Sequence, residues 1–515
     1  MYDVVIAGAG PVGLFLACEL ALARVSVLVL EKDFHSNLAW KAMPLGRRGL
    51  NTVAMEAFYR RGLLDGVSDP AERPSLVAKP GGPQFGGHFA GMPISTKDFD
   101  LSRRKWRLPS PALFPARTYM QRIEDVLAER ASILGVSIRR GEGFGRIEKE
   151  TSHDIEITTT KGSTLHGRWL VGCDGGRSTV RKEAGIAFEG TDARMTGYSI
   201  KCSVDYPERL KPGFHCADNG LWISAPGSIY LMDPDGGSFD RSQEPSKDHL
   251  QNVFERVSGI KDVKLAQVDY VGTFTDACRQ AALYRKGRVL LAGDSAHIHS
   301  PMGAQGLTAG IGDAMNLGWK LAAVVRGEKS EPACTSSRSI QDSLLDSYSK
   351  ERRPEGAWAL EWTRAQVLAL EPGLFGQAMR NLLTDLFATK DGTNMMLNNL
   401  WGLDQKYPTE EDESGHPLIG RSVPDFELPD GSRLGDHMHH GKGILLELED
   451  LPDAAKVRKG YEDRVEELNI RPTNTLGIDA LLIRPDGVVV WVAEEGIEPD
   501  LAALKKALET WFGCK

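Results

Sequence analysis

The sequence predicts a fold of mixed class, α/β together with α+β, in which a parallel-sheet domain is interleaved with a second β-sheet. Short apolar runs of the kind that form buried parallel strands occur at 4–7, 169–172 and 289–292. Each run leads into a glycine-containing loop. Residues 197–271, between the second and third runs, show strand and turn patterns instead. Core strands separated by another sheet predict a domain that is discontinuous in sequence.

The amino terminus has the order strand, G-x-G-x-x-G turn, helix, strand and acid. The turn begins at Gly8, and the second strand, Val25–Leu30, ends at Glu31. This order within roughly 30 residues is typical of the Rossmann-like dinucleotide fold. Gly8 permits the tight turn, Gly10 lets the backbone approach a pyrophosphate, and Gly13 lets the helix pack closely. The residues expected to contact the dinucleotide, NAD or FAD, are Gly8, Gly10, Pro11, Val12, Gly13, Glu31 and Lys32.

A second candidate site lies in the segment from Arg288 to Ala322. An apolar strand ends at Gly293-Asp294, and a loop then leads into a helical pattern near Ala309. The carboxylate can accept hydrogen bonds from ligand hydroxyl groups, and the free N–H groups of a helix start favour negative charge. The glycine and proline residues of this loop are Pro301, Gly303 and Gly306.

The middle segment, Trp169–Arg181, is again an apolar strand, and it ends at Asp174-Gly175. G-x-G-x-x-G, D-G-x-x-S-x-V-R and G-D-S-A-H occur in this order along the chain. Together they resemble the single-component FAD-dependent aromatic hydroxylases, of the para-hydroxybenzoate, phenol and polyketide-tailoring hydroxylase type. The resemblance spans residues 1 to about 370.

The resemblance implies that the cofactor is FAD and assigns roles to individual residues. Asp294 would bind the ribityl chain, and the backbone N–H groups of Gly306 and Leu307 would face the N1/C2 carbonyl edge of the flavin. Pro301 would lie beside the isoalloxazine ring. The family often has Asn where this chain has Thr308. The remaining expected FAD contacts are Asp174, Gly175, Gly303, Arg48 and Gln121, with Lys41 and Arg117 as competitors for the last two positions.

The substrate side of the site has no motif. Candidates for a catalytic or phenol-activating group on the inserted sheet are His215, Tyr230 and Arg194, and ordinary packing or surface exposure is the competing interpretation of each. Trp222, Met232 and Phe239 could line an apolar pocket or simply belong to the core.

The chain contains only one dinucleotide fingerprint, so we expect NADPH or NADH to visit as a transient co-substrate. The family chemistry then implies hydroxylation of an aromatic or phenolic small molecule, such as a secondary metabolite, with O2 through a flavin C4a-hydroperoxide. The alternatives are an epoxidase or Baeyer–Villiger monooxygenase, a flavin oxidase or dehydrogenase, and a non-catalytic flavin-binding module.

The composition limits the other classes. The net charge of −8 gives no basic surface for nucleic acid, and no apolar run is long enough to span a membrane. The seven cysteines are scattered without a C-x-x-C pair, which is typical of reduced thiols in a cytoplasmic protein. We expect no metal site, because His437, His439 and His440 fall in a polar turn.

These patterns divide the chain into domains. A boundary is expected in the acidic segment 410–415, and the domain after it resembles a thioredoxin-like domain without redox cysteines. Its expected role is packing, with homodimer formation as a further expectation. The expected FAD-binding domain comprises 1–75, 119–190 and 276–400 (the last with closing helices), the substrate-binding domain comprises 76–118 and 191–275, and the carboxy-terminal domain comprises 415–515.

Overall fold

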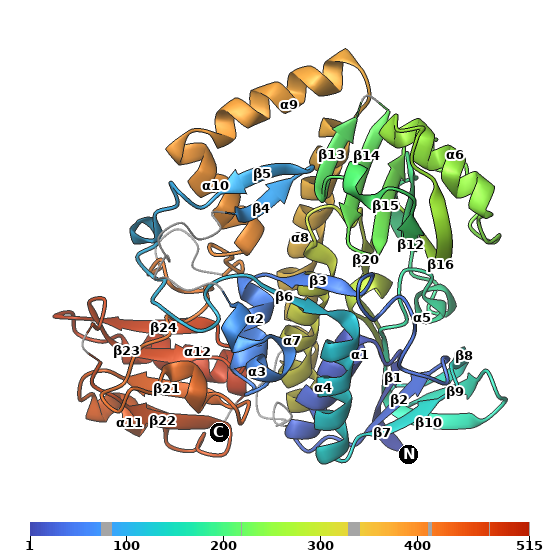
Figure 1. Cartoon of the computed structure of the whole chain (residues 1–515). Coiled ribbons are helices and arrows are strands. Elements are labelled where there is room, and N and C mark those ends of the chain that lie inside the picture. The colour runs from blue at the N-terminus through green and yellow to red at the C-terminus, as the bar shows by residue number, and fades with distance from the viewer. Residues whose placement is uncertain (74–84, 218, 328–339, 410–414, 473, 514–515) are drawn as a thin grey trace.

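The computed structural model describes residues 1–73, 85–217, 219–327, 340–409, 415–472 and 474–513. The acidic segment 410–415, which is expected as a boundary, lies almost entirely outside the described residues. The same holds for part of the segment 79–92, a loop rich in proline and glycine. Figure 1 shows a main sheet with its helices, a second sheet above it, and the carboxy-terminal domain at one side.

The main sheet contains β1 (Tyr2–Ala7), β2 (Val27–Glu31), β7 (Ser137–Arg140), β8 (Phe144–Glu150), β9 (Ile155–Thr159), β10 (Thr164–Gly172), β18 (Arg285–Lys286) and β19 (Val289–Leu291). Its strand order is β18-β19-β10-β1-β2-β7, with β9 and β8 extending it from β10. β1 is parallel to both β2 and β10, and β10 is parallel to β19. The three predicted apolar runs are therefore neighbouring core strands of one sheet, and this prediction is confirmed.

The helices of this domain are α1 (Pro11–Leu22), α2 (Thr52–Tyr59), α3 (Leu64–Val67), α4 (Met120–Ile133), α5 (Thr179–Glu183) and α7 (Gln305–Val325). α1 contacts both α4 and α7. One helix prediction needs correction: α7 begins at Gln305, before the expected start near Ala309, and the left-handed backbone of Ala304 at φ +55° marks its N-terminal boundary.

The inserted sheet is antiparallel and contains β12 (Thr196–Val204), β13 (Gly213–Ala217), β14 (Gly220–Ala225), β15 (Ser228–Asp233) and β16 (Leu265–Thr275). Its order is β13-β14-β15-β12-β16. One face is covered by α6 (Lys247–Ser258), a helix that was not predicted. The signal was present, because Leu250, Val253, Phe254 and Val257 have helical spacing and the Ser246 hydroxyl accepts a hydrogen bond from the His249 N–H.

Smaller elements and three helices close the space between the two sheets. The small sheets are β3 (Arg47–Leu50) with β6 (Ala116–Tyr119), β4 (Phe85–Phe89) with β5 (Met92–Ser95), and β11 (Phe188–Thr191) with β17 (Cys278–Ala281) and β20 (His297–Ile298). The closing helices are α8 (Ile340–Ala369), α9 (Leu374–Phe387) and α10 (Lys390–Trp401). They correspond to the closing helices that were expected within the segment 276–400.

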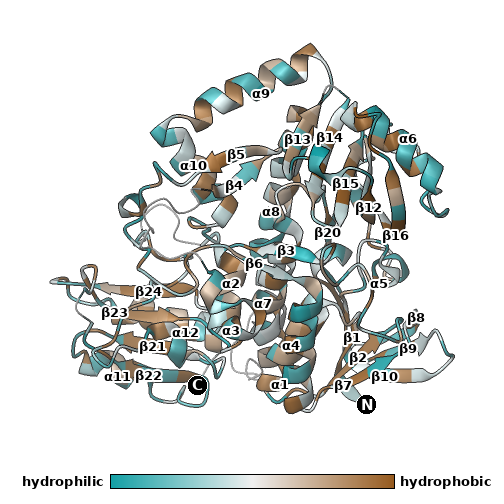
Figure 2. Ribbon diagram, viewed as in Figure 1, coloured by the Kyte–Doolittle hydropathy of each residue, from teal (hydrophilic) through white to brown (hydrophobic). Residues whose placement is uncertain are grey.

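The carboxy-terminal domain has its own mixed sheet of β21 (Gly443–Glu447), β22 (Val465–Asn469), β23 (Ile478–Ile483) and β24 (Val489–Glu494), in the order β22-β21-β23-β24. β22 is parallel to β21, whereas β23 is antiparallel to both β21 and β24. α11 (Pro452–Arg458) and α12 (Leu501–Phe512) complete the domain. Figure 2 shows apolar residues concentrated in these strands and in the main sheet.

Candidate functional site: a dinucleotide cleft beside an apolar chamber

The three predicted loops meet at one end of the main sheet. Gly8 has φ +105°, and a Cβ atom on it would lie 2.3 Å from the backbone oxygen of Cys173. A Cβ atom on Gly293 would lie 3.0 Å from a methyl group of Val12. The loop after β1 therefore contacts both the loop after β10 and the loop after β19. The carboxyl ends of adjacent parallel strands, where such cofactors bind, are brought together as the motifs predict.

The first loop leaves room for a ligand. A Cβ atom on Gly10 would meet no other atom within 4 Å, whereas one on Gly13 would lie 2.0 Å from the Gly8 backbone oxygen. α1 starts directly after Gly10, and no side chain caps its N-terminus. Its free N–H groups and the open space over Gly10 suit a pyrophosphate, so this loop fits the adenine-dinucleotide end of FAD.

Two of the three acidic side chains in these loops already accept hydrogen bonds from nearby backbone N–H groups. Glu31 accepts hydrogen bonds from the N–H groups of Ala9 (2.7 Å) and Asp33 (2.9 Å). Asp174 accepts hydrogen bonds from the Ser178 hydroxyl and from the N–H groups of Thr179 (2.7 Å) and Val180 (3.1 Å), which caps the start of α5. In the structure, both carboxylates shape the loops that would surround the cofactor.

Asp294 differs from these two acids. No described group donates a hydrogen bond to its carboxylate, and its side chain is exposed to solvent. The surrounding protein nevertheless raises the pKa of Asp294, mainly through burial, while His297 and Arg48 oppose the rise. A carboxylate that solvent reaches but protein surrounds lies at the base of a cleft. Asp294 is thus a free hydrogen-bond acceptor inside the cleft, as a ligand rich in hydroxyl groups requires.

Arg48 on β3 connects this cleft to the inserted sheet. Its Nη1 donates hydrogen bonds to the backbone oxygens of Leu45 (3.1 Å) and Arg47 (2.7 Å). Burial lowers the pKa of Arg48, and the nearby groups of Tyr230 and Asp294 oppose that effect. The Tyr230 hydroxyl donates a hydrogen bond to the Pro44 backbone oxygen at 3.3 Å. Arg48 is therefore close to both the ribityl-binding candidate and the substrate sheet.

The start of α7 forms the other end of the cleft. No side chain caps its N-terminus, so the N–H groups of Gly306 and Leu307 are placed where they could meet a carbonyl oxygen or a negative charge. Thr308 is buried, and its hydroxyl accepts a long hydrogen bond of 3.4 Å from the Asn51 N–H. The Thr308 side chain therefore contacts Asn51, the residue that caps the start of α2.

The remaining residues predicted to contact FAD differ in their exposure and in their hydrogen-bond partners. Lys32, Pro301 and the competitor Arg117 are exposed. Gln121 donates a hydrogen bond to Asp125 of the same helix at 2.7 Å, and its Oε1 has no partner among the described residues. The other competitor, Lys41, is buried in an ion pair with Glu124 at 2.6 Å, which leaves it little freedom to bind a ligand.

A cluster of buried apolar side chains, which we call the chamber cluster, adjoins the α7 end of the cleft. Met302, in the loop before α7, belongs to this cluster, which also includes side chains of β4, β5, α8, α9 and α10 and of the inserted sheet. The ring centroids of Phe89 and Trp362 are 5.1 Å apart, and those of Phe89 and Phe387 are 6.0 Å apart. Aromatic side chains of this kind favour contact with a planar apolar ligand.

Most of the candidates for the substrate side lie on one or the other face of the inserted sheet. Met232 packs in the chamber cluster, and Tyr230, two residues before it on β15, lies on the same face. Trp222 and Phe239 pack in the cluster around α6 instead. His215 stacks on Trp222 with ring centroids 4.0 Å apart, so it also lies on the α6 side. Arg194 is exposed and pairs with Glu371 at 3.4 Å.

Two polar residues beside the chamber were missed at the sequence level. Gln366 on α8 is completely buried; its Oε1 accepts a hydrogen bond from the Ala90 N–H at 2.9 Å, and its Nε2 donates one to the Met302 oxygen at 3.3 Å. It thereby ties the β4–β5 hairpin to the loop before α7. The Nε2 atom of His299 is buried without a partner. Neither residue lies in a recognisable motif, so only the repeated H-x-H spacing of His297 and His299 offered a signal.

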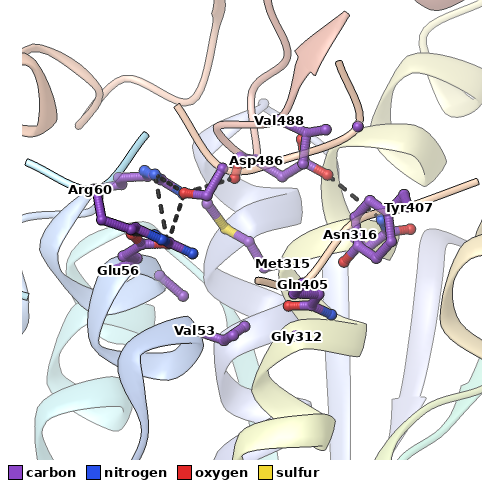
Figure 3. A pocket seen from close by; sticks show the side chains of 14 residues that line it. Val53, Glu56, Arg60, Gly312, Met315, Asn316, Gln405, Tyr407, Asp486 and Val488 are labelled. Carbon is purple, nitrogen blue, oxygen red and sulfur yellow. Dashed lines mark hydrogen bonds and ion pairs between the residues drawn. The ribbon is translucent and has the colours of Figure 1, made fainter. Parts of the chain in front are cut away.

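A separate small cavity lies between α2, α7 and the carboxy-terminal domain, as Figure 3 shows. Its volume is about 50 Å3, and its lining includes Glu56, Arg60, Asn316, Tyr407 and Asp486. Cofactor pockets measure roughly 300–1,000 Å3. This cavity therefore belongs to the packing between domains and not to the dinucleotide cleft.

Two further features concern metals and membranes. Across the described ranges, no group of three or more His, Cys, Asp and Glu side chains is arranged to hold a metal ion. Within the same ranges, no helix combines the length and apolar character needed to cross a bilayer.

The fold and the three loops together define a dinucleotide-binding protein with an apolar, aromatic cluster beside one end of its cofactor site. Comparison with known families makes this specific. Residues 1–363 match the family model described as "FAD binding domain", and residues 416–514 match the model described as "Aromatic-ring hydroxylase, C-terminal".

Full-length relatives agree with these matches. A protein of Claviceps purpurea, named as a monooxygenase, is 46% identical over 99% of this chain and 97% of its own length. The rifampicin monooxygenase of Streptomyces venezuelae is 34% identical over 100% of this chain and 99% of its own. The solved structure of the anhydrotetracycline hydroxylase of Streptomyces rimosus superposes with a TM-score of 0.82 at 32% identity, covering 100% of this chain and 99% of that one.

The chain belongs to the family of FAD-binding aromatic-ring hydroxylases. It is a flavin-dependent monooxygenase with FAD as its cofactor, and its homologues act in secondary metabolism. The family resemblance derived from the sequence motifs is confirmed.

Proposed function

We propose that this monooxygenase hydroxylates a polycyclic aromatic or phenolic small molecule, a secondary metabolite, with NAD(P)H and O2 as co-substrates. The observation that carries this proposal is the cluster of buried aromatic and apolar side chains next to the uncapped start of α7. The named substrates of the relatives, rifampicin and anhydrotetracycline, are large ring systems, which supports a substrate of this class.

When FAD is bound, it supplies the transfer of one oxygen atom from O2 with electrons from the nicotinamide donor. The protein's own groups would prepare the site for that chemistry. The α7 N–H groups would stabilise negative charge at the pyrimidine edge of the ring, and Asp294 would hold the ribityl hydroxyls. The chamber would exclude water from the reacting atoms.

Tyr230 is the polar side chain that we propose for orienting the substrate. It lies on the chamber face of the inserted sheet, near Arg48. Burial raises the pKa of Tyr230, so its hydroxyl stays protonated at neutral pH. Its single O–H group would exchange the long hydrogen bond of 3.3 Å to the Pro44 oxygen for one to the substrate. Donation to a phenolate or carbonyl oxygen would fix the ring relative to the cofactor. His215 and Arg194 have no such position, and we do not assign them a role.

We also propose that the carboxy-terminal domain has a thioredoxin-like fold. The strand order β22-β21-β23-β24, the parallel pair β21 and β22, and the final helix α12 support this proposal. This domain contributes no cysteine among its described residues, so no thiol chemistry is proposed for it.

The experiment is turnover of the holoenzyme with 18O2 and a panel of polycyclic phenols. The proposal predicts NAD(P)H-dependent product that carries one 18O atom on an aromatic carbon. An 18O atom inserted between ring carbons would instead indicate Baeyer–Villiger chemistry, and turnover without NAD(P)H would indicate an oxidase. An unlabelled isomer of the substrate would contradict the monooxygenase reaction itself.

A further inference from the structure

A chain of buried ion pairs crosses the boundary between the FAD-binding and carboxy-terminal domains. Arg484, just after β23, donates hydrogen bonds from Nη1 to Glu351 Oε1 at 2.6 Å and from Nη2 to Glu351 Oε2 at 2.9 Å. Its Nε donates to Asp486 Oδ1 at 3.0 Å. Arg484 is 1% exposed, Glu351 3% and Asp486 6%. These charges have exchanged almost all contact with water for contact with one another, and Asp486 also lines the small cavity of Figure 3.

The same carboxylate anchors α7. Glu351 Oε2 accepts hydrogen bonds from Lys320 Nζ at 2.8 Å and from Asn316 Nδ2 at 2.6 Å. Asp313, Asn316 and Lys320 have the spacing i, i+3 and i+7, so they lie on one face of α7. Glu351 therefore connects the carboxy-terminal domain to the helix whose N-terminus forms one end of the cofactor cleft.

The next residue of α8 continues the chain toward the cleft. Arg352 donates from Nε to Asp313 Oδ1 at 2.8 Å and from Nη1 to the Tyr407 hydroxyl at 3.0 Å. A Cβ atom on Gly312 would lie 2.8 Å from Arg352 Nη2. α7 thus carries glycine at a position where a side chain would displace this guanidinium.

Asp313 completes the connection to the flavin loop. Its Oδ2 accepts hydrogen bonds from the Gly293 N–H at 3.0 Å and from His297 Nε2 at 2.7 Å. Gly293 immediately precedes Asp294, and His297 follows three residues later. The Gly293 backbone on one side of Asp294 and the His297 side chain on the other are therefore held by a single buried carboxylate.

We propose that Arg352 and Arg484 are positioning residues for the flavin. Arg352 holds Asp313 directly, whereas Arg484 acts through Glu351 and its partners Asn316 and Lys320 on the same helix. Asp313 in turn holds the Gly293–His297 loop in the geometry that presents Asp294 to the ribityl chain. A buried charge that loses its partner is strongly destabilised, so this network has one favoured arrangement. The carboxy-terminal domain, which contributes no described residue to the three cofactor loops, thereby takes part in FAD binding through Arg484. This inference rests on the proposed role of Asp294.

The test compares three conservative variants, Arg352→Lys, Arg484→Lys and Arg61→Lys. Arg61 is the matched control, because it is 4% exposed, pairs with Glu19 at 2.7 Å, and donates hydrogen bonds to the carboxy-terminal backbone at Met438 and Pro485. It does not contact Asp313 or Glu351. Lysine keeps the charge of each arginine and loses the forked hydrogen bonding.

The readouts are the FAD Kd from titration of apoprotein, the melting temperature of each apoprotein, and amide exchange at Gly293–His297. All three variants should melt at a lower temperature than wild type. Arg352→Lys should raise the FAD Kd about 10-fold and Arg484→Lys about 3-fold, each with faster exchange in the loop, because supporting residues around a bound group commonly contribute about 10-fold or more to its affinity. Arg61→Lys should leave the Kd within about twofold of wild type.

Equal Kd values for all three variants would overturn the inference, as would unchanged loop exchange in Arg352→Lys. If Arg352→Lys does not fold, Arg484→Lys decides alone, because Glu351 keeps Lys320 and Asn316 as partners there. A separate titration of Asp294→Ala distinguishes failure of this inference from failure of the proposed role of Asp294, since that variant removes the ligand contact and leaves the network intact.

Discussion

The cofactor cleft and the boundary with the carboxy-terminal domain are both rich in charge, but they use it in opposite ways. In the cleft, Asp294 has no hydrogen-bond donor among the described residues, and the start of α7 has no side-chain cap. At the boundary, Glu351 receives hydrogen bonds from Arg484, Lys320 and Asn316. Unsatisfied groups mark the place where a ligand completes the structure, whereas satisfied ones mark a structure already complete.

The largest expected effect contrasts two glycines of the first loop. Gly10→Ala adds a methyl group where the apoprotein has open space, so the apoprotein should melt at the wild-type temperature and lose most of its FAD affinity. Gly8→Ala places its Cβ against the Cys173 backbone at a positive φ and should not yield folded protein. FAD titration and thermal melting measure both. Tight FAD binding by Gly10→Ala would remove the pyrophosphate from this loop.

The second effect probes the boundary through pH. The paired cations Arg484 and Lys320 lower the pKa of Glu351 to about 2 despite its burial. A depressed carboxylate pKa stabilises the fold above the unfolded value of 4.5, and this stabilisation disappears as the pH falls from about 4.5 toward 2. Glu351→Gln should therefore lose about 3 kcal/mol of unfolding free energy at pH 7.

Urea unfolding of wild type and Glu351→Gln across this pH range measures the difference. The two proteins should converge at the acidic end, because wild-type Glu351 is then becoming protonated. Asp100→Asn serves as the control, since this half-buried surface carboxylate should show a much smaller difference at pH 7. A gap between wild type and Glu351→Gln that stays constant with pH would contradict the pairing.

A third, smaller effect separates the two faces of the inserted sheet. Trp222→Ala removes a ring from the α6 side and should lower stability by about 3 kcal/mol with little change in substrate KM. Met232→Ala opens the chamber side and should change KM and the ratio of hydroxylated product to NAD(P)H consumed. Steady-state kinetics and product analysis on both variants test this assignment. The reverse pattern would place the chamber on the α6 face.

The smallest effect concerns the histidines near the chamber. Burial lowers the pKa of His88 and of His299 to about 4, so both are neutral from pH 6 upward. His88→Gln should therefore leave the shape of the kcat/KM profile between pH 6 and 8 unchanged, whatever its effect on the rate. Loss of an ionisation from that profile would show that His88 titrates during turnover.

The sequence revealed the cleft more fully than its surroundings. Gly8, Asp174 and Asp294 could be predicted to converge because each ends a core strand, and strand ends of a parallel sheet share one edge. The α6 helix was missed although its apolar spacing was visible, since the neighbouring strand patterns dominated the segment. The placement of His215 and Trp222 away from the chamber depends on which face each strand residue takes, and strand register is a tertiary property.

The boundary network could not be predicted at all. Arg484, Glu351 and Asp313 lie far apart in the sequence, and each fits an ordinary turn or helix surface when read locally. Only their packing shows that these charges neutralise one another, because burial and pairing arise together when the domains dock. Gln366 was missed for the same reason: its two hydrogen bonds join a hairpin and a loop that the sequence does not connect.

The most direct test of the account is the FAD affinity of Asp294→Ala measured on apoprotein. A free carboxylate at the base of the cleft predicts that the variant melts at or above the wild-type apoprotein temperature, since no intramolecular hydrogen bond is lost. The same variant should bind FAD about 10- to 100-fold more weakly, the loss expected for hydrogen bonds to a charged group. Wild-type FAD affinity in this variant would contradict the assignment of the three loops as one flavin site.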